Sequence, residues 1–116
     1  MKRLLTKVSV LVCFLILGTF SVQAQTYLSS DVALEKLELE LEDIYQDATA
    51  PTATNSAHTD WEIGKTFINE VAKHITENQS VPNALQSAFD RTVVAHADEQ
   101  IRVELMRQRL DALLQE

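Results

Sequence analysis

Apolar residues recur every three or four positions along three stretches of this chain, a spacing that lines up one face of an α-helix. The pattern predicts helices over about residues 31–46, 60–78 and 82–115, with a loop at 47–59. Regular alternation of β-branched residues, which would indicate strands, does not recur. We therefore expect an all-α fold, a small antiparallel helical bundle of three helices with a long C-terminal helix.

Residues that start helices support these boundaries. Ser29 or Ser30 can cap the first helix, and Ser80 can cap the last. Thr59 followed by Glu62 has the spacing of a capping box, which places the start of the second helix at about residue 60. The predicted core faces include, among others, the first-helix residues Leu34, Leu37, Leu41, Ile44 and Tyr45, and the second-helix anchor Trp61.

The length of the last helix is the main open point of the fold. Its apolar stripe continues through the middle, which favours one helix of about 34 residues, roughly 50 Å long. The same face nevertheless turns polar at His96, Glu99 and Gln100. The alternative is therefore four short helices with a break near Ala97, where Asp98 would cap the fourth helix.

The first 24 residues have the pattern of a cleaved export signal. A basic start precedes the apolar run from Val8 to Phe20, and Val22-Gln23-Ala24 offers a small-residue cleavage site. The run is shorter than the about 20 residues that span a membrane, although an uncleaved anchor is the alternative. We expect a signal peptide at 1–24, a flexible lead-in at 25–30 and a single helical domain at 31–116, located in the periplasm or outside the cell.

Cleavage would change the composition. It would remove the only cysteine and three of the ten basic residues, leaving seven basic against seventeen acidic residues and a net charge of −10. Nucleic acids and anionic membranes bind basic surfaces, so we expect neither as a partner, and no membrane insertion after cleavage. The four remaining arginines all lie in the last segment, whereas seven carboxylates lie on or beside the first helix. This distribution predicts that these two segments pack together.

Residues that could carry chemistry are few. With one glycine after residue 24 and no Gly-x-Ser-x-Gly turn, neither a phosphate loop nor a serine nucleophile turn is present. We expect no enzyme, no catalytic residue and no cofactor. Glu70, His74 and Glu77 share one side of the second helix and could offer one nitrogen and two oxygens to a metal ion. A solvated helix face is the ordinary explanation, so no metal site is assigned.

His96 interrupts an apolar stripe close to Glu99. Such a histidine could bind an ion or titrate near neutral pH and loosen the bundle. The favoured interpretation is a structural residue that forms a hydrogen bond with Glu99 or Gln100, as buried polar groups normally do. Both interpretations stay open at the level of the sequence.

A second apolar stripe indicates partners. It comprises Val94, Ile101 and Leu105 in the last segment, and Val32 and Leu39 lie off the main face of the first helix. These side chains either fit inside the bundle or mark an oligomer or partner groove. We expect an exported acidic protein that acts by protein–protein interaction, with another protein or with itself as a homodimer. The alternative is a periplasmic metal-binding or pH-responsive protein that uses His74 or His96 with nearby carboxylates.

Overall fold

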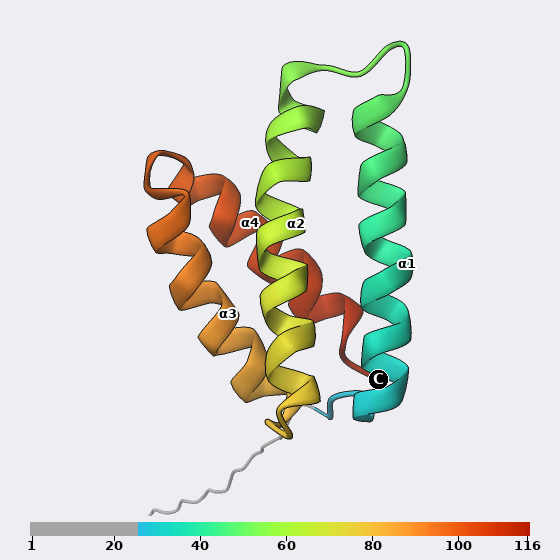
Figure 1. The fold of residues 1–116 in the computed structure, drawn as a ribbon, viewed down its shortest axis with the longest axis vertical. Helices are drawn as coiled ribbons and strands as arrows, with labels where there is room; N and C mark the ends of the chain where they lie inside the picture. Colours follow the sequence, from blue (N-terminus) through green and yellow to red (C-terminus); the bar gives the residue numbers. More distant parts are fainter. Residues whose placement is uncertain (1–25) are drawn as a thin grey trace, which may run out of the picture.

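The computed structural model describes residues 26–116, so the predicted signal at 1–24 lies outside the described residues. Within this range the chain forms four α-helices and one 3-10 helix: α1 (Ser30–Thr49), α2 (Asn55–Thr76), α3 (Val81–Ala95), η1 (Ala97–Glu99) and α4 (Gln100–Leu113). α1 and α2 run antiparallel, α3 lies beside α2, and α4 crosses behind them toward the start of α1 (Figure 1). The all-α bundle is confirmed. None of the helices in residues 26–116 combines the length and the apolar character needed to cross a membrane.

The loop between the first two helices is shorter than expected. α1 continues to Thr49 because Ala48 is buried in its last turn. α2 begins at Asn55, and the Thr54 hydroxyl accepts a hydrogen bond from the Ala57 amide at 3.1 Å. The predicted capping box at Thr59 is therefore wrong. The Thr59 hydroxyl instead donates to the Asn55 carbonyl inside the helix.

The last segment is broken, as in the alternative with four helices, and the single long helix is wrong. α3 ends at Ala95, and α4 begins after the 3-10 turn with no side-chain cap, so Asp98 does not cap it. A straight helix of roughly 50 Å would overhang α2, which at 22 residues is about 33 Å long. Folding back lets the apolar stripes of both halves reach the same core.

The second inter-helix turn follows its predicted residues. Asn78 has a positive φ of 71°, the left-handed conformation that asparagine tolerates at helix ends. The Ser80 hydroxyl then accepts from the Asn83 amide at 3.3 Å, and Pro82 stands in the first turn of α3, where its missing N–H costs nothing. The predicted Ser80 cap is therefore confirmed.

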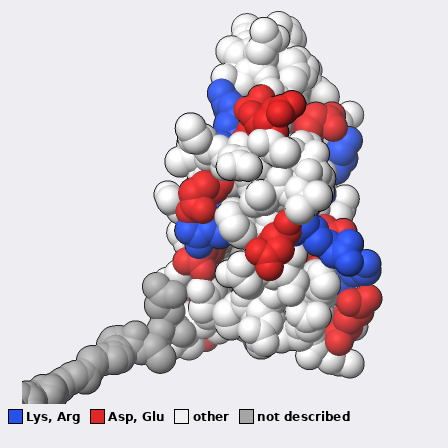
Figure 2. Space-filling model, turned by 90° about the vertical axis from the view of Figure 1, so that its left-hand side faces the viewer, with Lys and Arg blue, Asp and Glu red and all other residues white. Residues whose placement is uncertain are grey.

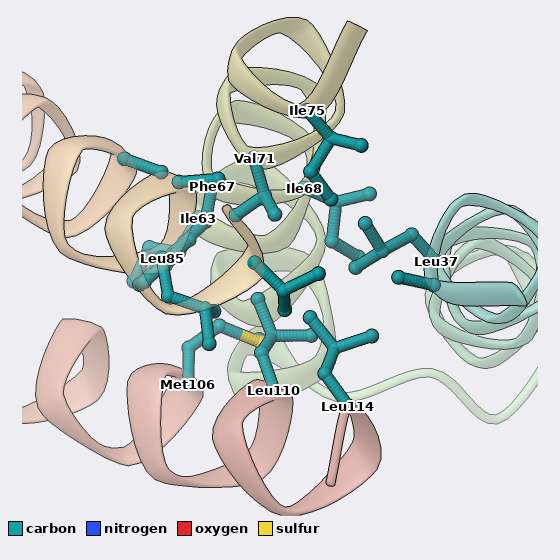
Figure 3. Close-up of a cluster of buried hydrophobic side chains, with 14 of the residues drawn as sticks. Leu37, Ile63, Phe67, Ile68, Val71, Ile75, Leu85, Met106, Leu110 and Leu114 are labelled. Atoms are coloured by element: carbon teal, nitrogen blue, oxygen red, sulfur yellow. The ribbon is translucent and has the colours of Figure 1, made fainter. Parts of the chain in front are cut away.

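The core lies where α2 meets the other three helices (Figure 3). Phe67 and Val71 of α2 are fully buried, and Leu37 of α1 and Leu110 of α4 approach α2 from two sides. Gly64 stands at this junction: a Cβ there would lie 3.1 Å from Ile44 Cδ1 and 3.5 Å from Met106 Cε. The glycine thus makes room for side chains of α1 and α4, rather than for a second backbone.

The segment expected to be a flexible lead-in pairs with the end of the chain. Tyr27 and Gln115 form an isolated antiparallel bridge. The Leu28 amide donates to the Leu114 carbonyl at 2.8 Å, and the Glu116 amide donates to the Thr26 carbonyl at 2.9 Å. The described part of the lead-in is therefore docked against α4.

Candidate functional site

The turn between α3 and α4 exposes three large apolar side chains. Val94 and Ile101 are each 79% exposed, and Leu105 is 57% exposed. Ile101 and Leu105 line the same open hollow of about 660 Å³, together with residues of η1. We call Val94, Ile101 and Leu105 the corner surface.

The outer side of α1 exposes two more of the predicted residues. Leu39 is 61% exposed and Val32 is 40% exposed. They stand seven residues apart, which is two helical turns, so they share one side of α1. We call this pair the α1 ridge. With all five residues exposed, the interpretation that they fit inside the bundle is wrong, and their role in an interaction stays a prediction.

The arginines of the last segment form ion pairs, but mostly not with α1. Only Arg109 reaches α1, where it pairs with Glu40 and lies 3.8 Å from Asp43. Arg102 instead pairs with Asp60 of α2 at 3.0 Å. The predicted attraction between α1 and the last segment therefore rests on one side chain. On the face of the molecule that includes α3, basic and acidic side chains lie next to each other (Figure 2).

Two further arginines pair with carboxylates outside α1, one on α2 and one within α4. Arg91 Nε of α3 lies 3.7 Å from Glu70 Oε1 of α2. Arg107 forms a hydrogen-bonded pair with Glu104 within α4, which lowers the pKa of the Glu104 carboxyl and raises that of Arg107. Its guanidinium also lies over the Phe89 ring, with Cζ 5.6 Å from the centroid. The charges of α4 are thus largely balanced by near neighbours.

The structure brings Glu70, His74 and Glu77 together along α2. His74 Nε2 lies 3.6 Å from Glu70 Oε1, and His74 Nδ1 lies 3.7 Å from Glu77 Oε1. The Gln79 amide nitrogen is 3.0 Å from Nδ1. Because an amide N–H donates, Nδ1 is the acceptor in this contact, and the other ring nitrogen, Nε2, faces Glu70.

His74 Nε2 faces the Glu70 carboxylate without forming a hydrogen bond. Glu70 Oε1 and His74 Nε2 are both buried atoms with no hydrogen-bond partner. Buried polar atoms are normally paired, so this contact is unusual within the fold. Within residues 26–116, no group of three or more histidine or acidic residues is placed so that it could hold a metal ion.

His96 and Glu99 do not form the expected pair. His96 Nε2 lies 3.1 Å from the Thr66 hydroxyl of α2, across the helix interface. Glu99 turns to Arg102, with Oε2 3.7 Å from Nε. The hydrogen bond expected from His96 to Glu99 or Gln100 is therefore replaced by one to α2, which fixes the broken end of α3 to its neighbour.

A hydroxyl–carboxylate contact fastens the N-terminal segment to α4. The Tyr27 hydroxyl donates to Asp111 Oδ1 at 2.5 Å. This hydrogen bond and partial burial raise the pKa of Tyr27 to about 12. Because ionised tyrosine would repel the Asp111 carboxylate, the contact holds only while the phenol keeps its proton.

A pocket between α1 and α2 was missed by the sequence analysis. Glu38, Leu41, Glu42 and Tyr45 of α1 and Trp61 of α2 line an open space of about 420 Å³. The Tyr45 and Trp61 rings meet edge to face, with centroids 5.0 Å apart. Tyr45, predicted as a core residue, is 49% exposed, and Trp61 is only partly buried. The two residues are sixteen positions apart, so no local spacing could reveal the pocket.

Comparison with known proteins adds no assignment. The chain matches none of the family models, curated proteins or solved structures against which it was compared. The function must therefore be argued from its own side chains.

Proposed function

We propose that this protein is an exported, acidic helical module that acts by binding another protein or a second copy of itself, without catalytic activity. The observation that carries the proposal is the corner surface. Its two most exposed side chains, Val94 and Ile101, are each 79% exposed at the turn between two helices.

The energetics of apolar surfaces favour a contact there. Single exposed apolar side chains are ordinary, but Ile101 and Leu105 line one and the same hollow. Fully burying a side chain of this size contributes about 1.5–3 kcal/mol. Covering the corner surface would therefore supply a substantial part of the free energy of a specific complex.

Export is part of the proposal. The basic start, the apolar run and the Ala24 cleavage motif support it. N-terminal sequencing of the protein recovered from the periplasm or the medium should begin at Gln25. Recovery from the cytoplasm with Met1 retained would contradict export.

The interaction is tested by removing the corner surface. We expect the double variant Ile101→Ser with Leu105→Ser to lose the partner captured from the protein's own cells, or to lose self-association measured as mass in solution. The control, Gln46→Ser with Asn69→Ser, changes two exposed residues outside the corner surface and the α1 ridge and should retain the same complex. A wild-type protein that is monomeric and captures no partner would overturn the proposal.

A pH response is the second candidate. It is favoured by the contact between His74 Nε2 and Glu70 Oε1, two buried atoms that have no hydrogen-bond partner. A protonated His74 would face Glu70 and Glu77, with Arg91 of α3 beside Glu70. We expect the difference in Tm between about pH 5.5 and about pH 7.5 to shrink in His74→Gln. An unchanged difference would exclude this candidate. The metal alternative gains no support from these distances; a rise in Tm with Zn²⁺ would be needed to revive it.

A further inference from the structure

The pocket between α1 and α2 combines two aromatic rings with two carboxylates. Glu38 and Glu42 stand one turn apart on α1, and Trp61 faces them from α2. Aromatic faces attract ammonium and guanidinium groups, and carboxylates accept hydrogen bonds from them. Carboxylates and aromatic ring faces in one pocket are suited to a cationic group.

The structure contains an internal example of this attraction. The Lys65 ammonium lies over the Trp61 ring, 5.3 Å from its centroid. Lys65 is held there by Glu62, with Nζ 3.4 Å from Oε1, and it is not part of the pocket lining. The indole of Trp61 therefore already attracts one cation within the chain.

The two pocket carboxylates are available to a partner. Among residues 26–116, neither Glu38 nor Glu42 forms an ion pair, whereas Glu40 on the other side of α1 is paired with Arg109. The only basic residue of α1 is Lys36, which lies about 160° around the helix from Glu38 at 100° per residue. Nothing within α1 neutralises this side of the helix.

The α1 ridge continues the surface beyond the pocket. On the same angular scale, Glu42 lies between Glu38 and Leu39, and Leu39 is 61% exposed. An occupant that fills the pocket with a cationic group thus meets an apolar side chain next to it. A single small amine would use only the pocket, and exposed charge contacts are individually weak.

We infer that the pocket between α1 and α2 binds a lysine or arginine side chain of a basic amphipathic partner segment, whose apolar residues pack on the α1 ridge. Charge complementarity argues for this occupant over a second copy, because the described residues carry seven basic against seventeen acidic side chains. The inference rests on the proposed function and names the chemistry of one partner.

Trp61 gives a direct readout, because it is the only tryptophan in the chain. The probe is a synthetic helical peptide with leucines seven residues apart flanked by lysines. We expect saturable change in Trp61 fluorescence with the whole protein, and at least fivefold weaker binding by Glu38→Gln with Glu42→Gln. The matched control, Asp47→Asn with Glu116→Gln, removes the same charge outside the pocket and should bind like the wild type.

Four outcomes would overturn the inference. In the first two, both double variants bind the peptide equally weakly, or a peptide with glutamine in place of lysine binds the protein as tightly as the lysine peptide does. In the other two, free butylamine binds the protein as tightly as the peptide does, or Trp61 fluorescence changes with protein concentration alone. If the peptide does not bind, but the Ile101 and Leu105 variant loses a partner that the wild type captures, this inference is overturned and the proposed function stays intact. Failure of all capture would overturn the proposed function itself.

Discussion

α1 and α4 both carry apolar side chains on two sides, yet their charges differ. The arginines of α4 are paired with acidic neighbours on α1, α2 or α4 itself. Glu38 and Glu42 of α1 have no cationic partner among residues 26–116. Two stripes that look alike in sequence therefore form surfaces of different kinds. The corner surface is apolar with balanced charge around it, whereas the outer side of α1 is apolar with an acidic border.

The sharpest test of this comparison lies within α4, between its buried and exposed sides. Leu110 is fully buried, and Leu105 is 57% exposed. Leu110→Ala should lower the free energy of unfolding by about 3 kcal/mol because it removes core contacts and leaves a cavity. Leu105→Ala should change it by less than about 0.5 kcal/mol. Urea unfolding measures both, and similar losses would mean that Leu105 belongs to the core.

The next largest effect is expected where α1 and α4 meet over Gly64. Gly64→Val should lower the free energy of unfolding by about 2 kcal/mol, since the valine methyl groups would overlap Ile44 and Met106. Gly64→Ala should be close to neutral: the single Cβ presses on the mobile end of Ile44, while alanine gains about 1 kcal/mol in helix propensity. Thermal unfolding separates the two variants. Stabilisation by valine would show that this junction is loosely packed.

Removing the hydrogen bond between Tyr27 and Asp111 of α4 should lower the free energy of unfolding by a smaller amount, which depends on pH. Tyr27→Phe should cost about 1 kcal/mol at neutral pH through loss of the hydrogen bond to Asp111. Tyr27 has a pKa of about 12 in the folded protein, against about 10 for a free tyrosine. Between these values the unfolded chain loses the phenol proton first, so stability falls as pH rises.

Tyr27→Phe should therefore show a shallower alkaline loss of stability than the wild type. Tyr45→Phe is the matched control, because within residues 26–116 the Tyr45 hydroxyl forms no hydrogen bond. Denaturant unfolding between about pH 9 and about pH 11.5 gives the slopes. Parallel curves for wild type and Tyr27→Phe would refute the contribution of Tyr27.

The smallest expected effect concerns the single ionic link between α4 and α1. Arg109 is 42% exposed, so Arg109→Gln should cost only about 0.5 kcal/mol at low salt and nothing measurable at about 1 M salt. Arg107→Gln, whose ion pair stays within α4, serves as the comparison. A loss that persists at high salt would indicate that Arg109 acts through packing.

Sequence periodicity predicted which helix faces are buried better than it predicted where helices end. Leu37 and Ile44 fall on a predicted core face and are buried, because periodicity records burial directly. The start of α2 was missed because threonine and asparagine cap helices and also occupy their first turns. Only the Thr54 contact to Ala57 decides between these roles.

The break after α3 and the pocket depended on contacts distant in sequence. His96 turned the stripe polar, which indicated a break without settling it; the hydrogen bond to Thr66 lies thirty residues away. Tyr45 and Trp61 had the spacing of core residues, but they line an open pocket between α1 and α2. Such positions follow from how helices meet, which one helical period cannot specify.

The pairing of residues 26–28 with residues 114–116 has a consequence for the order of folding. α1, α2 and α3 can form contacts with neighbours close in sequence, but the first described residues find their hydrogen bonds only in the last ones. Contacts so distant in sequence form late, since a long chain segment must first be ordered. Until residues 100–116 fold back onto α1, α2 and α3, one side of the core of these helices is uncovered.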